Sequence, residues 1–91
     1  MSTPSVENVT SPTTGRAIPN QFLIYTDEGV IFQSYSSVIA FRDHAGHVTL
    51  DRDKWDYSTT TGKYRNLFLH EKKADTERKI ADGTYDLDDL N

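Results

Sequence analysis

Basic side chains and aromatic rings are interleaved near the end of the chain, and they are the residues of this sequence best suited to binding a ligand. Cations that neutralise phosphates, together with rings on which bases stack, are what single-stranded nucleic acid requires of a binding surface. Acidic residues at positions 71, 75 and 77 interrupt the pattern, and mixed charges favour the solvated face of helices over such a surface. The candidate binding residues are Lys63, Tyr64, Arg65, Lys72 and Lys73, and Phe68, Arg78 and Lys79 complete the segment.

A small group of metal-ligand side chains occurs at Asp43, His44 and His47. A closed zinc site needs four ligands, and these three residues straddle a turn whose geometry already accounts for Asp43 and Gly46. Solvated turn residues are therefore the preferred interpretation.

Asp51 and Asp53 begin like a calcium-binding loop. Such a loop needs glycine at its sixth position and glutamate at its twelfth, where this chain has Asp56 and Gly62. The calcium loop is rejected, and we predict no metal and no other cofactor.

Hydroxyl groups at positions 34, 36, 37 and 58 are the candidate nucleophiles. None of these serines lies in a nucleophile-elbow pattern, and no histidine is placed by the sequence to act as their base. The chain is therefore predicted not to be an enzyme.

The composition describes one small globular protein. The 91 residues are 35% hydrophobic and 26% charged, with no cysteine and a net charge of -4. The lack of thiols fits a reducing cytoplasm, and neither a signal peptide nor an apolar stretch of about 20 residues is found. We expect a cytoplasmic protein with no membrane partner, and the modest charge gives little attraction for nucleic acid.

Residues 1–19 differ in composition from the rest of the chain. They hold all three prolines and many serines and threonines, but no aromatic residue. Such a segment buries too little apolar surface to offset its ordering entropy. We predict a flexible N-terminal arm over residues 1–19 and a single domain over residues 20–91; the alternative is an arm that folds onto a partner through Ile18.

Alternating apolar residues between positions 21 and 51 predict a three- to four-stranded antiparallel β-meander. Its turns are expected at residues 27–29 and 43–46, where glycines close the loops, and a bend is expected within the serine-rich residues 34–37. One face of the sheet is expected to be buried.

Helical spacing follows the meander. Ser58 or Thr59 can cap a helix near residues 59–70, in which Gly62 is an unfavourable residue. A shorter helix near residues 75–82 would begin with Asp75 as its N-cap and end before Gly83. The fold class is therefore α+β, with one or two short helices covering the meander and residues 84–87 as a further edge strand. The predicted core comprises Phe22, Ile24, Ile31, Ile39, Phe41, Val48, Leu50, Trp55, Tyr64, Leu67 and Phe68.

Spaced polar and aromatic positions also carry a family resemblance over residues 20–91. They are Phe32, Ser34, Tyr35, Ser37, Ile39, Ala40, Val48, Leu50, Asp51, Trp55, Tyr57, Ser58, Thr60, Thr61, Lys63, Tyr64, Asn66, Phe68 and Leu69, followed by the C-terminal residues 84–87 and 89–91. This series resembles a family of small bacteriophage proteins of unknown function. The resemblance implies a phage origin and supplies neither an activity nor a site residue.

The expected function is that of a small phage accessory protein that binds a host protein without catalysis. The host protein would belong to defence, transcription or replication. The phage origin follows from the resemblance, and binding follows from the small size and the lack of catalytic groups. The alternative is a nucleic-acid-binding module that uses the Lys63–Lys79 surface.

A symmetric homodimer is also predicted, because a small sheet exposes two edges. The edge would be Gln21–Thr26 or Tyr85–Leu87; the first carries no charge, and edges without lysine, proline or a bulge recruit another chain. A strand of a host protein is the alternative occupant of that edge.

Overall fold

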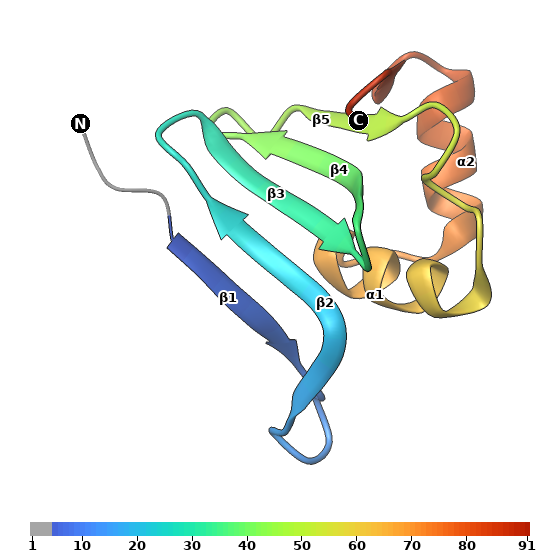
Figure 1. Ribbon diagram of the computed structural model, residues 1–91. Helices are drawn as coiled ribbons and strands as arrows, with labels where there is room; N and C mark the ends of the chain where they lie inside the picture. The colour runs from blue at the N-terminus through green and yellow to red at the C-terminus, as the bar shows by residue number, and fades with distance from the viewer. Residues whose placement is uncertain (1–4) are drawn as a thin grey trace.

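The computed structural model describes residues 5–91, which form one six-stranded sheet and two helices (Figure 1). The spatial order of the strands is β1-β2-β3-β4-β5-β6. The predicted α+β class is confirmed, but the sheet has six strands where three or four were predicted. The elements are β1 Ser5–Thr10, β2 Ala17–Tyr25, β3 Gly29–Ser34, β4 Ser37–Asp43, β5 Val48–Asp51, α1 Thr59–Leu69, α2 Lys73–Ala81 and β6 Asp86–Asp88.

Turn chemistry fixes the central meander, as predicted. Gly46 donates its backbone N–H to the Asp43 carbonyl at 3.0 Å and has a φ of 90°, which suits glycine. Gly29 has a φ of 155°, and a Cβ there would lie 2.2 Å from the carbonyl oxygen of Arg42. The expected bend between β3 and β4 is a two-residue connection in which Tyr35 has a φ of 56°.

The N-terminal segment is ordered in part, which corrects the prediction of a flexible arm. Strand β1 pairs antiparallel with β2, so the sheet begins before residue 20; residues 1–4 lie outside the described part of the chain. Most side chains of β1 are exposed. The prediction considered side-chain burial, whereas an edge strand also gains backbone hydrogen bonds from its neighbour.

The sheet edges also differ from the prediction. The segment Gln21–Thr26 is not an edge, because β2 is paired on one side with β1 and on the other with β3. The edges are β1 and β6. Strand β6 pairs parallel with β5, and the two helices form the crossover that parallel pairing requires. The predicted edge strand near residues 84–87 is therefore present, shifted to Asp86–Asp88.

Both helices follow local sequence signals. Ser58 caps α1 by accepting a hydrogen bond from the Thr61 backbone N–H at 3.1 Å. Helix α2 begins at Lys73, earlier than predicted, because Asp75 is not the N-cap. It lies in the first turn, where its carboxylate accepts from the Lys72 backbone N–H at 3.4 Å. Neither of these helices, nor any other helix within residues 5–91, is long and apolar enough to span a membrane.

The two helices lie on one side of the sheet (Figure 1). The buried core is made of side chains from the sheet and from α1, together with Tyr85. Of the predicted core, five residues are confirmed as buried: Ile39, Val48, Leu50, Tyr64 and Phe68. Trp55 is half-buried against them. Leu67 is 38% exposed and was wrongly included, whereas the prediction missed Phe32, Ala40, Leu69 and Tyr85.

The remaining predicted core residues, Phe22, Ile24, Ile31 and Phe41, lie on the opposite face of the sheet. Ile24 pairs with Ile31, and Ile31 with Phe41, and directly paired residues share a face. Successive residues alternate between faces, so Leu23 and Phe32, rather than Phe22 and Ile31, point toward the helices.

Candidate functional site

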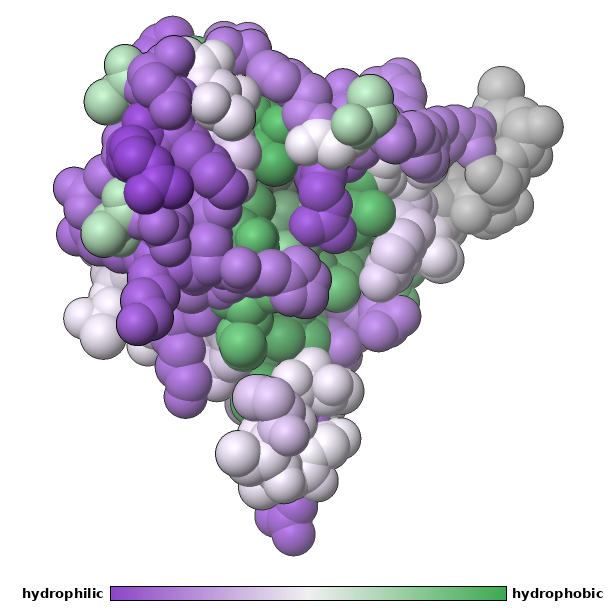
Figure 2. All heavy atoms as spheres, turned by 180° about the vertical axis from the view of Figure 1, so that it is seen from behind, coloured by the Kyte–Doolittle hydropathy of each residue, from purple (hydrophilic) through white to green (hydrophobic). Residues whose placement is uncertain are grey.

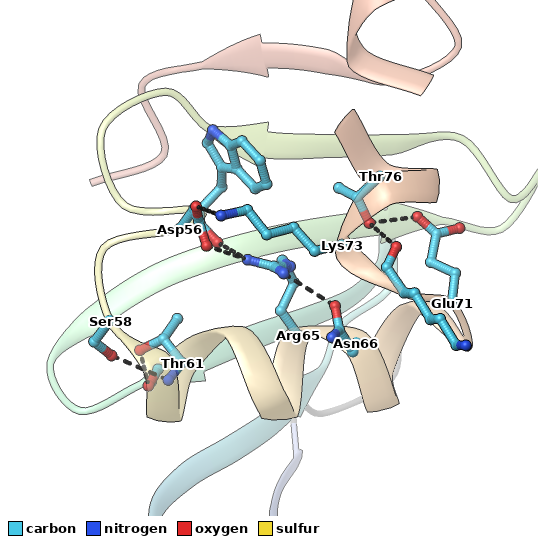
Figure 3. Close-up of polar contacts among 11 residues, drawn as sticks. Asp56, Ser58, Thr61, Arg65, Asn66, Glu71, Lys73 and Thr76 are labelled. Carbon is cyan, nitrogen blue, oxygen red and sulfur yellow. Dashed lines mark hydrogen bonds and ion pairs between the residues drawn. The ribbon is translucent and has the colours of Figure 1, made fainter. Parts of the chain in front are cut away.

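The predicted basic surface is interrupted at Arg65, which is buried rather than presented to a ligand. Its side chain is 1% exposed, and the guanidinium carbon lies 5.1 Å from the centre of the Trp55 ring. Figure 3 shows Arg65 extending from α1 toward Asp56. One guanidinium nitrogen donates to the Trp55 carbonyl at 2.7 Å and to the Asp56 carboxylate at 3.1 Å, and the other donates to the Asn66 side-chain oxygen at 3.0 Å. Arg65 therefore connects the β5–α1 segment to α1.

Asp56 joins two of the candidate basic residues. Its second carboxylate oxygen lies 2.6 Å from Lys73 Nζ, so the same side chain pairs with Arg65 and Lys73 (Figure 3). Burial alone would raise the pKa of Asp56, but the hydrogen bonds from Lys73 and Arg65 outweigh it and lower that pKa below its usual value. The Asp56 carboxylate therefore neutralises part of the positive charge that nucleic-acid binding would require.

The other candidates do not form a continuous surface. Tyr64 is buried, and Lys63 is exposed beside it with its ammonium 5.4 Å from the ring centre. Lys72 is exposed at the start of α2. A shallow hollow of about 640 Å³ brings Lys63, Arg65 and Lys73 together with Asp56, but its lining does not include Tyr64 or Lys72.

Glu71 holds a second cluster that the sequence did not reveal. Its carboxylate accepts hydrogen bonds from Lys79 at 2.6 Å, Thr76 at 2.6 Å and the Tyr85 hydroxyl at 2.8 Å. Burial would raise the pKa of Glu71, but these hydrogen bonds lower it. The cluster fixes α2 and the segment before β6 to the end of α1, so Lys79 also has a structural partner.

The two histidines of the Asp43, His44 and His47 group, which was considered and rejected as a metal site, occupy separate positions. His47 Nε2 lies 2.8 Å from the Asp86 carboxylate, whereas His44 Nε2 lies 2.7 Å from the Asp27 carbonyl oxygen. Asp43 instead accepts hydrogen bonds from the backbone of its own turn. Within residues 5–91, no group of three or more His, Asp or Glu side chains is placed to hold a metal ion.

An uncovered apolar surface lies on the side of the sheet that faces away from the helices. We call it the open face; it consists of Phe22, Ile24, Ile31, Val38 and Phe41. All five side chains are half-buried by one another and by their neighbours. Apolar runs in β2, β3 and β4 are the sequence signal for this surface, because a continuous run places apolar side chains on both faces.

A second apolar surface lies on the helix side, between α1 and the β1–β2 hairpin. Figure 2 shows hydrophobic residues in a central hollow between the helices and the N-terminal strands. We call this hollow of about 360 Å³ the hairpin groove. Its apolar and aromatic lining includes Val9, Leu23, Tyr25, Tyr64, Leu67 and Phe68.

Comparison with known protein families identifies one family whose match covers most of the chain. The model of DUF8033, a family of unknown function, matches residues 5–83. That match spans the sheet from β1 to β5 and both helices. No curated protein and no solved structure matches the chain. Because the family model covers far more than half of the sequence, the chain belongs to the family of unknown function DUF8033.

Proposed function

We propose that this protein acts by binding another protein, and that the open face is the contact surface. The observation that carries this proposal is the row of apolar side chains across β2, β3 and β4 with no helix over them. Apolar patches that a small protein leaves uncovered are characteristic of protein interaction sites. Binding would shield the part of each side chain that water now reaches.

The bacteriophage origin and the host partner are the finer parts of this proposal. They rest on the resemblance carried by the spaced aromatic and polar residues between positions 32 and 69. The protein would be a non-catalytic phage accessory factor whose partner belongs to host defence, transcription or replication. The cytoplasm of the host is the expected place of action.

The size of the open face sets a limit on this interaction. Three strands of about five residues each would form a surface of roughly 14 by 17 Å, or roughly 240 Å² in projection. A standard interface buries about 800 Å² on each partner. The contact would therefore extend past the open face onto its rim, or form a transient complex.

Nucleic-acid binding through Lys63–Lys79 is the second candidate. The geometry gives it less support, because Arg65 and Lys73 pair with Asp56 and Lys79 pairs with Glu71. Counterion release requires cations that are free to contact phosphates, and these three cations already have carboxylate partners.

Affinity purification from a bacterial lysate, with and without nuclease treatment, tests the proposal. The tagged protein should retain one protein partner after nuclease treatment. Ile24→Lys places a charge on the open face and should abolish retention. Leu67→Lys makes the same kind of change in the hairpin groove and should leave retention unchanged, provided that both variants melt cooperatively.

Two results would contradict the proposal. Recovery of nucleic acid without protein would favour the second candidate. Loss of the partner in Leu67→Lys, but not in Ile24→Lys, would move the contact surface to the hairpin groove.

A further inference from the structure

One end of the open face carries an apolar hollow with acidic residues at its rim. The β2–β3 and β4–β5 turns meet at this end, where His44 Nε2 lies 2.7 Å from the Asp27 carbonyl oxygen. The hollow has a volume of about 450 Å³, within the range of pockets that bury small ligands. It is lined by Ile31, Val38, Phe41 and Leu90, with Asp27 and Glu28.

The floor of this hollow is held in place by the C-terminal residues. The Leu90 backbone N–H donates to the Asp51 carboxylate at 2.8 Å. The Asn91 side chain accepts from the Val38 backbone N–H at 2.7 Å and donates to the Val38 carbonyl at 3.0 Å. The hollow is therefore preformed, which lowers the ordering cost of binding.

On the open side of the six strands, the charged side chains are acidic. Among the six strands the sole Lys or Arg is Arg42. Its guanidinium lies on the helix side, 4.4 Å from the centre of the Phe68 ring. Asp43 follows Arg42 in β4, so its side chain lies on the open side. Asp86 pairs with Thr49, whose partner in β4 is Phe41, so Asp86 also lies on the open side, where its carboxylate is 2.8 Å from His47 Nε2. An apolar centre with an acidic end is the result.

We propose that the partner inserts an apolar side chain into this hollow and places a neighbouring lysine or arginine beside Glu28. The inference rests on the proposed function, because it specifies the chemistry of the segment that the open face binds. Opposite charges at the rim of an apolar contact determine which partner is accepted and how fast it associates.

A second copy of this chain fits the open face less well. Each chain carries a net charge of -4, so two copies packed open face against open face would bring like-charged molecules together. Like charges across an interface disfavour association. A cationic segment of a different protein meets no such opposition.

Selection of peptides from a random display library on the immobilised, full-length protein tests the inference. Peptides retained by the wild type should combine an aromatic or aliphatic residue with a flanking Lys or Arg. Glu28→Lys should weaken a representative peptide by about tenfold, as expected for reversing one charge at an interface rim. Glu7→Lys has the same change in charge on the helix-facing side of β1 and should leave the affinity unchanged.

The outcomes separate this inference from the proposed function. Three outcomes would overturn the proposal of a cationic partner segment: retained peptides that are neutral or acidic, no enrichment of any peptide, or equal peptide affinity for the wild type and Glu28→Lys. If Ile24→Lys nevertheless abolishes capture of the lysate partner, the open face still binds protein. If Phe41→Lys, which changes the lining of the hollow, and the wild type retain the same cationic peptides with equal affinity, the inference and its contact surface both fail.

Discussion

Replacing Arg65 with methionine tests whether this residue is structural, as its buried position indicates. Methionine keeps much of the side-chain volume but removes the charge and all guanidinium donors. The Trp55 carbonyl and the Asn66 side-chain oxygen then lose the hydrogen bonds they accept at 2.7 and 3.0 Å. Asp56 retains Lys73 at 2.6 Å and is partly exposed, so little is lost there.

The expected cost follows from these separate contributions. Leaving the partly buried Trp55 carbonyl without a partner costs about 1–3 kcal/mol, and a further lost hydrogen bond costs about 1 kcal/mol. The sum of roughly 2–4 kcal/mol is a large part of the free energy of unfolding of a domain of this size, which is on the order of 5–14 kcal/mol. The melting temperature should fall by about 8–30 °C.

Urea denaturation followed by circular dichroism measures this change, and Lys63→Met is the matched control. Lys63 lies on the same helix, is exposed and has no carboxylate partner among the ion pairs found within residues 5–91, so its replacement should change stability by about 0.5 kcal/mol or less. A double-mutant cycle with Asp56→Asn isolates the pair. The reasoning is refuted if Arg65→Met costs no more than Lys63→Met.

Four further outcomes are expected. Phe32→Ala should lower the free energy of unfolding, measured by urea denaturation, by about 3–5 kcal/mol, because Phe32 is fully buried. Phe41→Ala on the open face should lower it clearly less, and equal losses would contradict the assignment of the two faces. Gly62→Ala should raise the melting temperature, by a gain of about 1 kcal/mol, because the new Cβ would lie 3.6 Å from the guanidinium nitrogens of Arg65, an ordinary van der Waals contact; a loss would reveal a steric role. The pKa of Glu71 is lowered in the folded protein, so its contribution to stability is present above the usual pKa of 4.5 and is lost as the pH falls through the lower folded-state pKa. Acid titration of Glu71→Gln should therefore show a shallower loss of stability than that of the wild type. The homodimer was predicted through Gln21–Thr26, which β1 covers; a dimer through the exposed edge β1 instead should give a light-scattering mass that rises above 10.3 kDa with concentration. Val6→Lys should prevent the rise, and a constant mass would exclude that dimer over the range measured.

Local signals made the meander and the helices predictable. The Ser58 cap and the glycine at the end of the Asp43 turn depend on residues a few positions apart, and both appear as expected. The β1 strand has no comparable signal, because its exposed side chains do not alternate in polarity and its stabilising groups belong to the backbone.

The candidate basic site could not be judged from spacing alone. Arg65 and Lys73 lie eight positions apart, but both pair with Asp56 in the preceding segment, and Glu71 accepts from Tyr85 across a helix. Such partners are brought together only by tertiary structure. The open face was missed for a related reason, since alternation separates two faces of a strand but does not identify the face that helices will cover.

The order of elements along the chain has a consequence for synthesis on the ribosome. Strands β1 to β5 each pair with the next strand in sequence, and hairpins form within about 1–10 μs. Both helices and β6 are encoded later, so at about 5–20 residues per second the 40 residues after Asp51 take about 2–8 s to add. During those seconds the nascent meander has apolar side chains on both faces and no helix to cover either, and it is then that a chaperone would be needed most.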